Sequence, residues 1–179
     1  MVTKNFKAVM ALVLQKCSTA YGTLPVKATN GTTYYASPNF GTSGFPGTLT
    51  QSFSRSNTTA GIQLGTGTNP ATADDYMLQS IITATSVSCA ISQAPSIDEN
   101  GNPYLILTLA ITNTGSSAVT ISEIGYAQSI YAATALAGTS CSGRVCLIDR
   151  TVLAEPITIP ANGGQGYIAY KLMTQVASE

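Results

Sequence analysis

The sequence contains no histidine and no tryptophan, and only 9% of its 179 residues are charged. Without histidine, Ser-His-Asp and Cys-His nucleophile pairs and His-ligated zinc are excluded. About a quarter of the residues of a globular domain are usually charged, so the surface of this chain must be unusually neutral. No other acid–base motif replaces the missing histidine, and we therefore predict that the protein is not an enzyme.

Charge of one sign is not in excess either, because eight Lys and Arg balance eight Asp and Glu. Binding to nucleic acid needs a basic surplus that neutralises phosphates, so no nucleic-acid partner is expected. Net charge near zero favours self-association. Apolar residues make up 44% of the chain, enough for a core beneath a surface of hydroxyls and amides. The composition predicts a homo-oligomer or a subunit of a larger assembly.

Four cysteines are too few for a disulfide scaffold. Cys141 and Cys146 lie five residues apart around Gly143. They are either two buried thiols in a strand and its turn or a local disulfide, and the sequence leaves this open. Neither Cys17 nor Cys89 brings a second close ligand, so no zinc site is predicted, and no cofactor is expected.

The N-terminal segment, residues 1–20, carries apolar side chains at helical spacing, with Thr3 or Asn5 as a cap. We predict a short apolar helix or arm there, with a strand and a secretory signal peptide as alternatives. The apolar run is too short to span a membrane. Exposed hydrocarbon would be a liability in a protein so poor in charge, so we expect a neighbouring subunit to cover it. The predicted assembly interface consists of Phe6, Val9, Met10, Val13 and Leu14.

After the N-terminal segment, short apolar or hydroxyl-rich runs are separated by Gly, Pro and Asn. Asn30-Gly31 is typical of a hairpin turn. Residues 104–112 alternate with a period of two, which indicates a strand. Strands about eight to twelve residues apart are typical of an all-β sandwich or barrel. We therefore predict a mainly β fold, with a single β-sandwich of jelly-roll or immunoglobulin-like arrangement over residues 21–179.

The remaining strand assignments follow the same pattern, whereas residues 76–85 could form either a short helix or a strand. The other expected strands are 32–35, 49–54, 62–64, 87–91, 119–124, 128–133, 145–153, 157–159 and 166–172. Their apolar residues should form the core, namely Leu105, Leu107, Leu109, Ile111, Ile121, Ile124, Leu147, Val152, Leu153, Ile157, Ile159, Ile168 and Leu172.

Two loop motifs bear on ligand binding. Residues 65–68, Gly-Thr-Gly-Thr, are rich in glycine but lack the Lys-Ser/Thr ending of a phosphate-binding loop and the third glycine of a dinucleotide loop, so a turn is predicted. Residues 98–102 are similar to the start of an EF-hand loop, but Leu109 stands where the closing glutamate belongs. A hairpin turn is the better interpretation there.

The acidic residues offer two further candidates. Asp74 and Asp75 could bind calcium together with nearby carbonyls, or one of them could cap the segment that begins at Tyr76. Glu123 and Asp149 are the only acids within strand-like stretches, and a glycosidase would need two acids facing one cleft. A half-buried acid needs a counter-charge, so we predict structural pairing of these two acids with Arg150 and Arg144.

Three stretches, taken together and in this order, resemble structural proteins of tailed bacteriophages and prophages. They are AGIQLGTGT at 60–68 with PATADDYML at 70–78; LTLAITNT at 107–114 with ISEIGY at 121–126; and LIDRTVL at 147–153 with PITIPANGG at 156–164 and YIAYKL at 167–172. The resemblance covers roughly residues 60–172 and brings no catalytic residues.

The resemblance implies a structural component of a virion: a tail, connector, baseplate or fibre-attachment protein whose partners are its own copies and other virion proteins. A capsid decoration or head-fibre protein is the first alternative. The second is a secreted adhesin or carbohydrate-binding module, in which Tyr34, Tyr35 and Phe40 would stack on a host-surface glycan. No membrane partner is expected.

Overall fold

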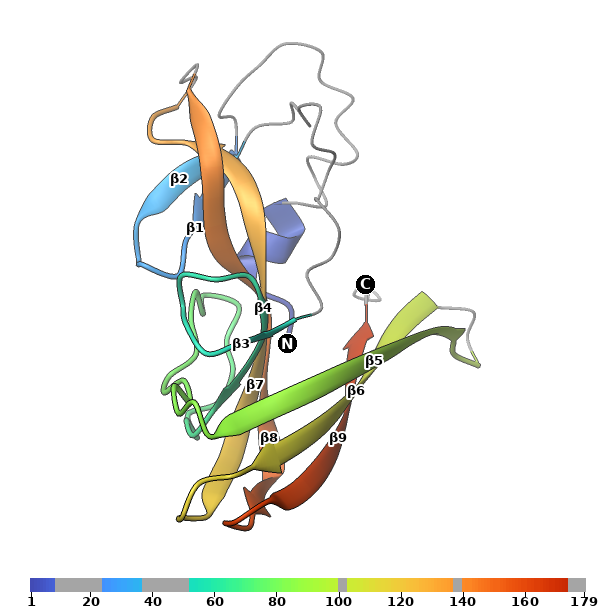
Figure 1. The fold of residues 1–179 in the computed structure, drawn as a ribbon. Helices are drawn as coiled ribbons and strands as arrows, with labels where there is room; N and C mark the ends of the chain where they lie inside the picture. The colour runs from blue at the N-terminus through green and yellow to red at the C-terminus, as the bar shows by residue number, and fades with distance from the viewer. Residues whose placement is uncertain (9–23, 37–51, 100–102, 137–139, 174–179) are drawn as a thin grey trace. The chain divides into compact units, whose positions relative to one another are not determined.

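The computed structural model describes residues 1–8, 24–36, 52–99, 103–136 and 140–173 (Figure 1). The chain is mainly β, with two sheets and a short helix at residues 4–8, as the sequence predicted, and is consistent with a β-sandwich-like fold. The strands are β1 (Leu24–Lys27), β2 (Thr33–Ala36), β3 (Phe53–Ser54), β4 (Gly61–Gly65), β5 (Val87–Ile97), β6 (Pro103–Asn113), β7 (Val119–Ala133), β8 (Cys141–Ile159) and β9 (Gly164–Met173).

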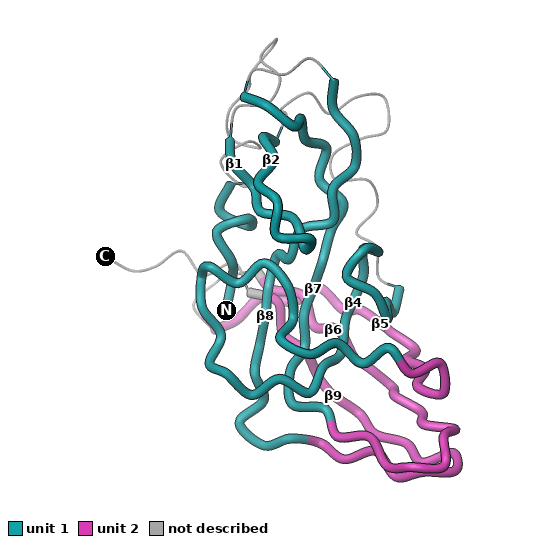
Figure 2. Tube along the Cα trace, turned by 90° about the vertical axis from the view of Figure 1, so that its left-hand side faces the viewer, with its two compact units in different colours: residues 1–83, 121–156 teal, residues 84–120, 157–179 magenta. Residues whose placement is uncertain are grey.

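The chain divides into two compact units, each assembled from separate stretches of sequence (Figure 2). Unit 1 comprises residues 1–83 and 121–156, and unit 2 comprises residues 84–120 and 157–179. The predicted boundary between an N-terminal segment and the β-domain, at residue 20, lies outside the described residues.

Unit 1 is built on a sheet with the strand order β1-β2-β7-β4-β3, and β8 pairs with β7. β4 runs antiparallel to β7, so that Leu64 is opposite Ile124, and both side chains are buried. β3 and β4 are parallel neighbours. Near the N-terminus, Val2 forms an isolated bridge with Asp149 of β8. The first residues of the chain therefore belong to unit 1.

The β1–β2 hairpin turns where the Asn-Gly pair predicted it. Gly31 has a φ of +81°, which glycine adopts without steric cost. Asn30 stabilises the turn, since its side-chain oxygen accepts a hydrogen bond of 2.9 Å from the Thr32 amide. The strands are then paired from Lys27 opposite Thr33 outward.

Unit 2 is built on the antiparallel sheet β5-β6-β9. In its central rung, Leu109 lies between Ile91 and Ile168. Leu109 is fully buried, whereas its neighbour Thr108, on the opposite face, is exposed. The alternation predicted for this stretch is confirmed, because successive side chains of a strand point to opposite faces.

Most of the predicted core is buried. Eight of the thirteen residues are buried, and the remaining five are half-buried: Leu105, Val152, Leu153, Ile157 and Leu172. Leu105 and Leu172 are opposite each other one rung from the end of the β6–β9 pairing. Fewer neighbours cover a side chain at the end of a sheet, which explains their partial exposure.

Three element predictions need correction. Residues 76–85 form neither a helix nor a strand, apart from an isolated bridge between Gly65 and Ile81. The amides of Gln79 and Ser80 donate to a side chain, that of Glu123, instead of to a regular backbone ladder. The strands predicted on either side of residues 125–127 are one continuous strand, β7, and those on either side of residues 154–156 are one strand, β8.

Candidate functional site

The predicted assembly interface falls largely outside the described residues. Phe6 lies in the short helix and is half-buried. Val9, Met10, Val13 and Leu14 are not among the residues that the structure describes. The helix that carries Phe6 begins after Thr3, whose carbonyl accepts the Phe6 amide at 3.1 Å.

Polar side chains attach this segment to unit 1. The Thr3 hydroxyl donates to the carbonyl oxygen of Leu147 at 2.7 Å, so it bonds to β8 instead of capping the helix. Asn5 is 4% exposed, donates to the carbonyls of Lys27 and Leu147, and accepts the Lys27 amide. The sequence suggested these two residues only as caps. Their structural role is to tie residues 3–5 to β1 and β8.

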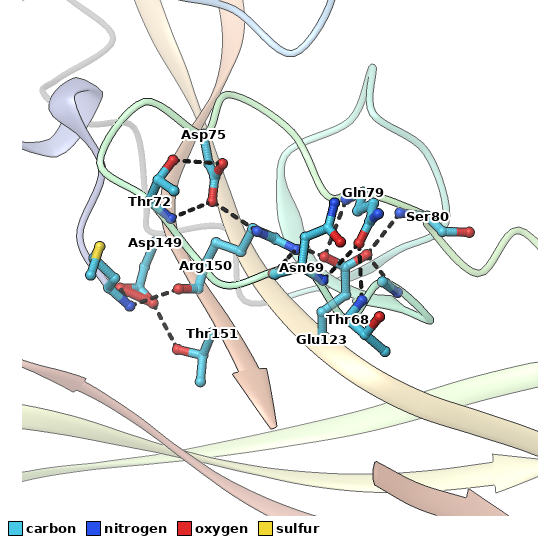
Figure 3. A network of polar contacts seen from close by, with 12 residues as sticks. Thr68, Asn69, Thr72, Asp75, Gln79, Ser80, Glu123, Asp149, Arg150 and Thr151 are labelled. Atoms are coloured by element: carbon cyan, nitrogen blue, oxygen red, sulfur yellow. Dashed lines mark hydrogen bonds and ion pairs between the residues drawn. The ribbon is translucent and has the colours of Figure 1, made fainter. Parts of the chain in front are cut away.

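A polar network of unit 1 surrounds Glu123, which lies on β7 and is fully buried (Figure 3). Its Oε1 accepts the amides of Gly67 at 3.1 Å and Ser80 at 2.8 Å. Its Oε2 accepts the Gln79 amide at 3.1 Å and Nε of Arg150 at 2.8 Å. Each carboxylate oxygen thus has two N–H donors, which compensates for the desolvation of the charge.

Arg150, on β8, extends the network to a second acid. Its Nη1 donates to Oδ2 of Asp75 at 2.8 Å, and its Nη2 donates to the Asn69 carbonyl at 3.1 Å. Burial alone would lower the pKa of Arg150, but the hydrogen bonds and charges of Asp75 and Glu123 outweigh it and raise that pKa. The guanidinium therefore stays charged and holds the 66–80 loop on β8.

Asp75 is held on both sides. Its carboxylate accepts the amide of Thr72 at 2.8 Å and the Thr72 hydroxyl at 3.0 Å in addition to Arg150. Burial raises the pKa of this carboxyl, but the hydrogen bonds from Thr72 and the Arg150 guanidinium outweigh that effect and lower the pKa overall. The Asp75 carboxylate thus accepts hydrogen bonds from Thr72, which precedes it in the chain. It does not cap the segment that begins at Tyr76.

Of the two predicted ion pairs, one is confirmed and the other is wrong. Glu123 does pair with Arg150. Asp149 instead lies 3.2 Å from the amino group of Met1. Arg144 stacks over the ring of Tyr34, with its guanidinium carbon 4.3 Å from the ring centroid. A guanidinium over an aromatic face is stabilised by electrostatic attraction even without an acidic partner. This contact explains why Arg144 does not need Asp149 as its partner.

The remaining acidic candidate, Asp74, forms an exposed ion pair with Lys4 at 2.5 Å. Among the described residues, no three His, Cys, Asp or Glu side chains gather closely enough to hold a metal ion. Tyr34 is 8% exposed beneath Arg144, so it cannot serve as the stacking platform proposed from the sequence. Tyr35 is half-buried, and Phe40 lies outside the described residues.

The cysteines of the described part are free thiols. Cys141 and Cys146 both lie on β8, where five residues of extended chain separate them by about 16 Å, too far for a disulfide. Burial raises the pKa of the Cys146 thiol to about 12 and that of Cys89 to about 11. These thiols remain protonated and unreactive at neutral pH.

The geometry of the Glu123 network indicates a structural role, because every carboxylate oxygen of Glu123 is already hydrogen-bonded. Within the described part of the chain, no helix is long and apolar enough to cross a membrane. Scans against family models, curated proteins and solved structures found no match.

Proposed function

We propose that this chain is a structural subunit of a tailed-phage virion, placed in the tail, connector, baseplate or fibre attachment, and that it acts by protein–protein assembly. The assignment to a virion rests on the resemblance of residues 60–172. A role in assembly is supported by one observation above all, the composition of the exposed face of the unit 2 sheet.

That face is nearly free of charge. Strand register places its side chains in continuous rows, such as Ser92, Thr108 and Ala169 across β5, β6 and β9. Of the nine positions on this face that the structure describes as exposed, only Lys171 is charged, and the Lys171 ammonium lies 3.8 Å from the centroid of the Tyr104 ring. The nine positions are Ser88, Ala90, Ser92, Ala94, Thr108, Gln165, Tyr167, Ala169 and Lys171.

Interfaces between proteins are poor in charge at their centre and richer in tyrosine than other surfaces. Small side chains and hydroxyls let a partner approach closely and form uncharged hydrogen bonds. Tyr167, 67% exposed, would supply an anchoring aromatic ring. The low charge of the face and its exposed Tyr167 support a protein contact, and its neutrality argues against steering of a charged ligand.

Mass spectrometry of purified particles from the organism that carries the gene tests the proposal. The chain is expected in intact particles, at a constant ratio to other virion proteins. Copies that remain with separated heads would favour the capsid-decoration alternative. A chain found only outside particles would contradict a virion function.

A variant then tests the sheet face. Thr108→Arg places a charge at the centre of the exposed face. The buried side chain of the next residue, Leu109, lies on the opposite face of the sheet. It should keep the circular-dichroism spectrum of the wild type and lose incorporation into particles. Ser116→Arg, at an exposed loop position of the same unit, is the matched control and should be incorporated normally.

A further inference from the structure

The glycine-rich stretch at residues 65–68 lacks the features of a phosphate loop, yet in the structure it surrounds an oxyanion. The anion is the carboxylate of Glu123. A Cβ at Gly65 or Gly67 would lie 2.5 Å from Oε1 of Glu123, closer than real Cβ contacts come. Glycine at both positions is what lets the backbone approach the carboxylate.

The donors around this carboxylate converge from separate parts of the chain. The Gly67 amide comes from the start of the 66–80 loop, those of Gln79 and Ser80 come from its end, and Nε of Arg150 comes from β8. Backbone amides that point at one centre form an anion-binding concavity. A guanidinium adds a charge-assisted hydrogen bond.

The loop also has contacts that close it without Glu123. The Thr66 amide donates to the Ser80 carbonyl at 2.8 Å. The side-chain oxygen of Gln79 accepts the amides of Thr68 and Asn69, at 2.9 and 3.0 Å. Figure 3 shows the two bonds that Thr68 and Asn69 form with Gln79.

Arg150 is likewise oriented independently of Glu123, because its other nitrogens bond to Asp75 and to the Asn69 carbonyl. Glu123 itself belongs to β7 and lies 43 residues along the chain from Ser80 and 56 from Gly67. The donor set and the carboxylate are thus two separate parts of the fold, comparable to a receptor and a ligand.

We infer that residues 65–80 together with Arg150 form a carboxylate-binding site that Glu123 occupies from within the same chain. When the Glu123 side chain is shortened, the site takes up a small free carboxylate. Glu123→Ala removes Cγ and the carboxylate group, which are the heavy atoms of acetate. Acetate is therefore the ligand that matches the space, with formate smaller and propionate too long.

The test measures the thermal unfolding of Glu123→Ala in sodium acetate against sodium chloride of equal ionic strength, at neutral pH. The variant should unfold at a lower temperature than the wild type in chloride. Acetate should raise its Tm saturably, by about 3–6 °C at a tenfold excess over Kd. The amide resonances of Gly67, Gln79 and Ser80 should shift with the same midpoint.

Matched controls separate a site from a general salt effect. Acetamide has the shape of acetate without its charge and should not raise the Tm of Glu123→Ala. Asp149→Ala removes another buried acid from the neighbouring strand, whose carboxylate contacts the Thr151 hydroxyl and the Met1 amino group, and its Tm should be indifferent to acetate. Wild type, with the site already filled, should be indifferent as well.

The inference is overturned if acetate and chloride act alike on Glu123→Ala, or if acetate raises the Tm of wild type and Asp149→Ala by the same amount. Should Glu123→Ala fail to fold in chloride, refolding from urea in acetate should restore the wild-type circular-dichroism spectrum. Failure to refold in acetate also overturns it, because a closed donor set needs only its ligand. None of these outcomes depends on the virion proposal.

Discussion

At the scale of single residues, neutral side chains form many of the hydrogen bonds that stabilise this protein. Asn113, at the end of β6, is fully buried and connects two loops of unit 2. Its Nδ2 donates to the carbonyl of Ser117 at 2.8 Å and to that of Pro160 at 3.2 Å, while its Oδ1 accepts the Gly115 amide at 3.0 Å. One amide group thus satisfies backbone groups from both loops.

Asn113→Ala is expected to lower the free energy of unfolding by about 1–3 kcal/mol, because it leaves buried carbonyls and an amide without partners. Urea denaturation measures the loss. Thr114→Ala, which removes an exposed hydroxyl hydrogen-bonded to Ser86, is the matched control and should stay within about 0.5 kcal/mol of wild type. Equal losses for both variants would refute the special role of Asn113.

The lowered pKa of Asp75 makes a second residue-scale prediction. A carboxyl whose pKa is lower in the folded state stabilises the fold at pH values above its unfolded pKa, and this contribution is lost as the pH falls through the folded pKa. Asp75→Asn should therefore be less stable than wild type at pH 7. The difference should shrink as the pH falls below about 4.

Denaturation midpoints of the two proteins across pH 2–7 measure this difference. Asp74→Asn is the control, because the ion pair of Asp74 with Lys4 is exposed, and such pairs contribute little to stability. A gap between Asp75→Asn and wild type that does not change with pH would mean that the Asp75 charge is not what stabilises the loop.

At the scale of elements, the Leu109 rung is the strongest test of strand register. Leu109→Ala should cost about 2–5 kcal/mol, because the fully buried side chain leaves a cavity between Ile91 and Ile168. Thr108→Ala, one residue away on the exposed face, should change stability by less than about 0.5 kcal/mol. A loss below about 1 kcal/mol for Leu109→Ala would show that the register is wrong.

The strands of unit 2 could be predicted because alternation of side chains is a local pattern that one burial face imposes. The continuity of β8 could not be, since Ala154, Glu155 and Pro156 interrupt the apolar pattern without ending the strand. The 66–80 loop was out of reach for a different reason. Three of its amides donate to Glu123, and contacts so distant in sequence leave no periodic signal.

The candidate site, too, could be predicted only in part from the sequence. Pairing of Glu123 with Arg150 followed from the cost of burying a charge, which holds for any fold. The contacts of Asn5 and Asn113 could not be predicted, because a neutral amide leaves no comparable constraint in the sequence. The contact of Arg144 with the ring of Tyr34 could not be predicted either, because a ring so distant in sequence leaves no charge pattern.

At the scale of the whole molecule, the prediction that remains to be tested is assembly through the N-terminal segment. Deleting residues 1–16 would not isolate that role, because Thr3 and Asn5 are hydrogen-bonded to β1 and β8 of unit 1. Their loss would lower the stability of the subunit itself. The apolar residues beyond residue 8 must be changed while residues 1–8 stay intact.

Simultaneous replacement of Val9, Met10, Val13 and Leu14 by serine does this. Burial of four such side chains against a neighbour is worth about 6–12 kcal/mol before the cost of ordering the chain, so their loss should abolish incorporation into particles. Light scattering should show smaller oligomers than wild type, whereas the midpoint of urea unfolding should hardly change.

Asn5→Ala is the converse control, since it should lower that midpoint and leave the apolar residues available for contact. Normal copy number of the fourfold variant in particles would remove the segment from the assembly interface and leave the neutral sheet face of unit 2 as the contact surface.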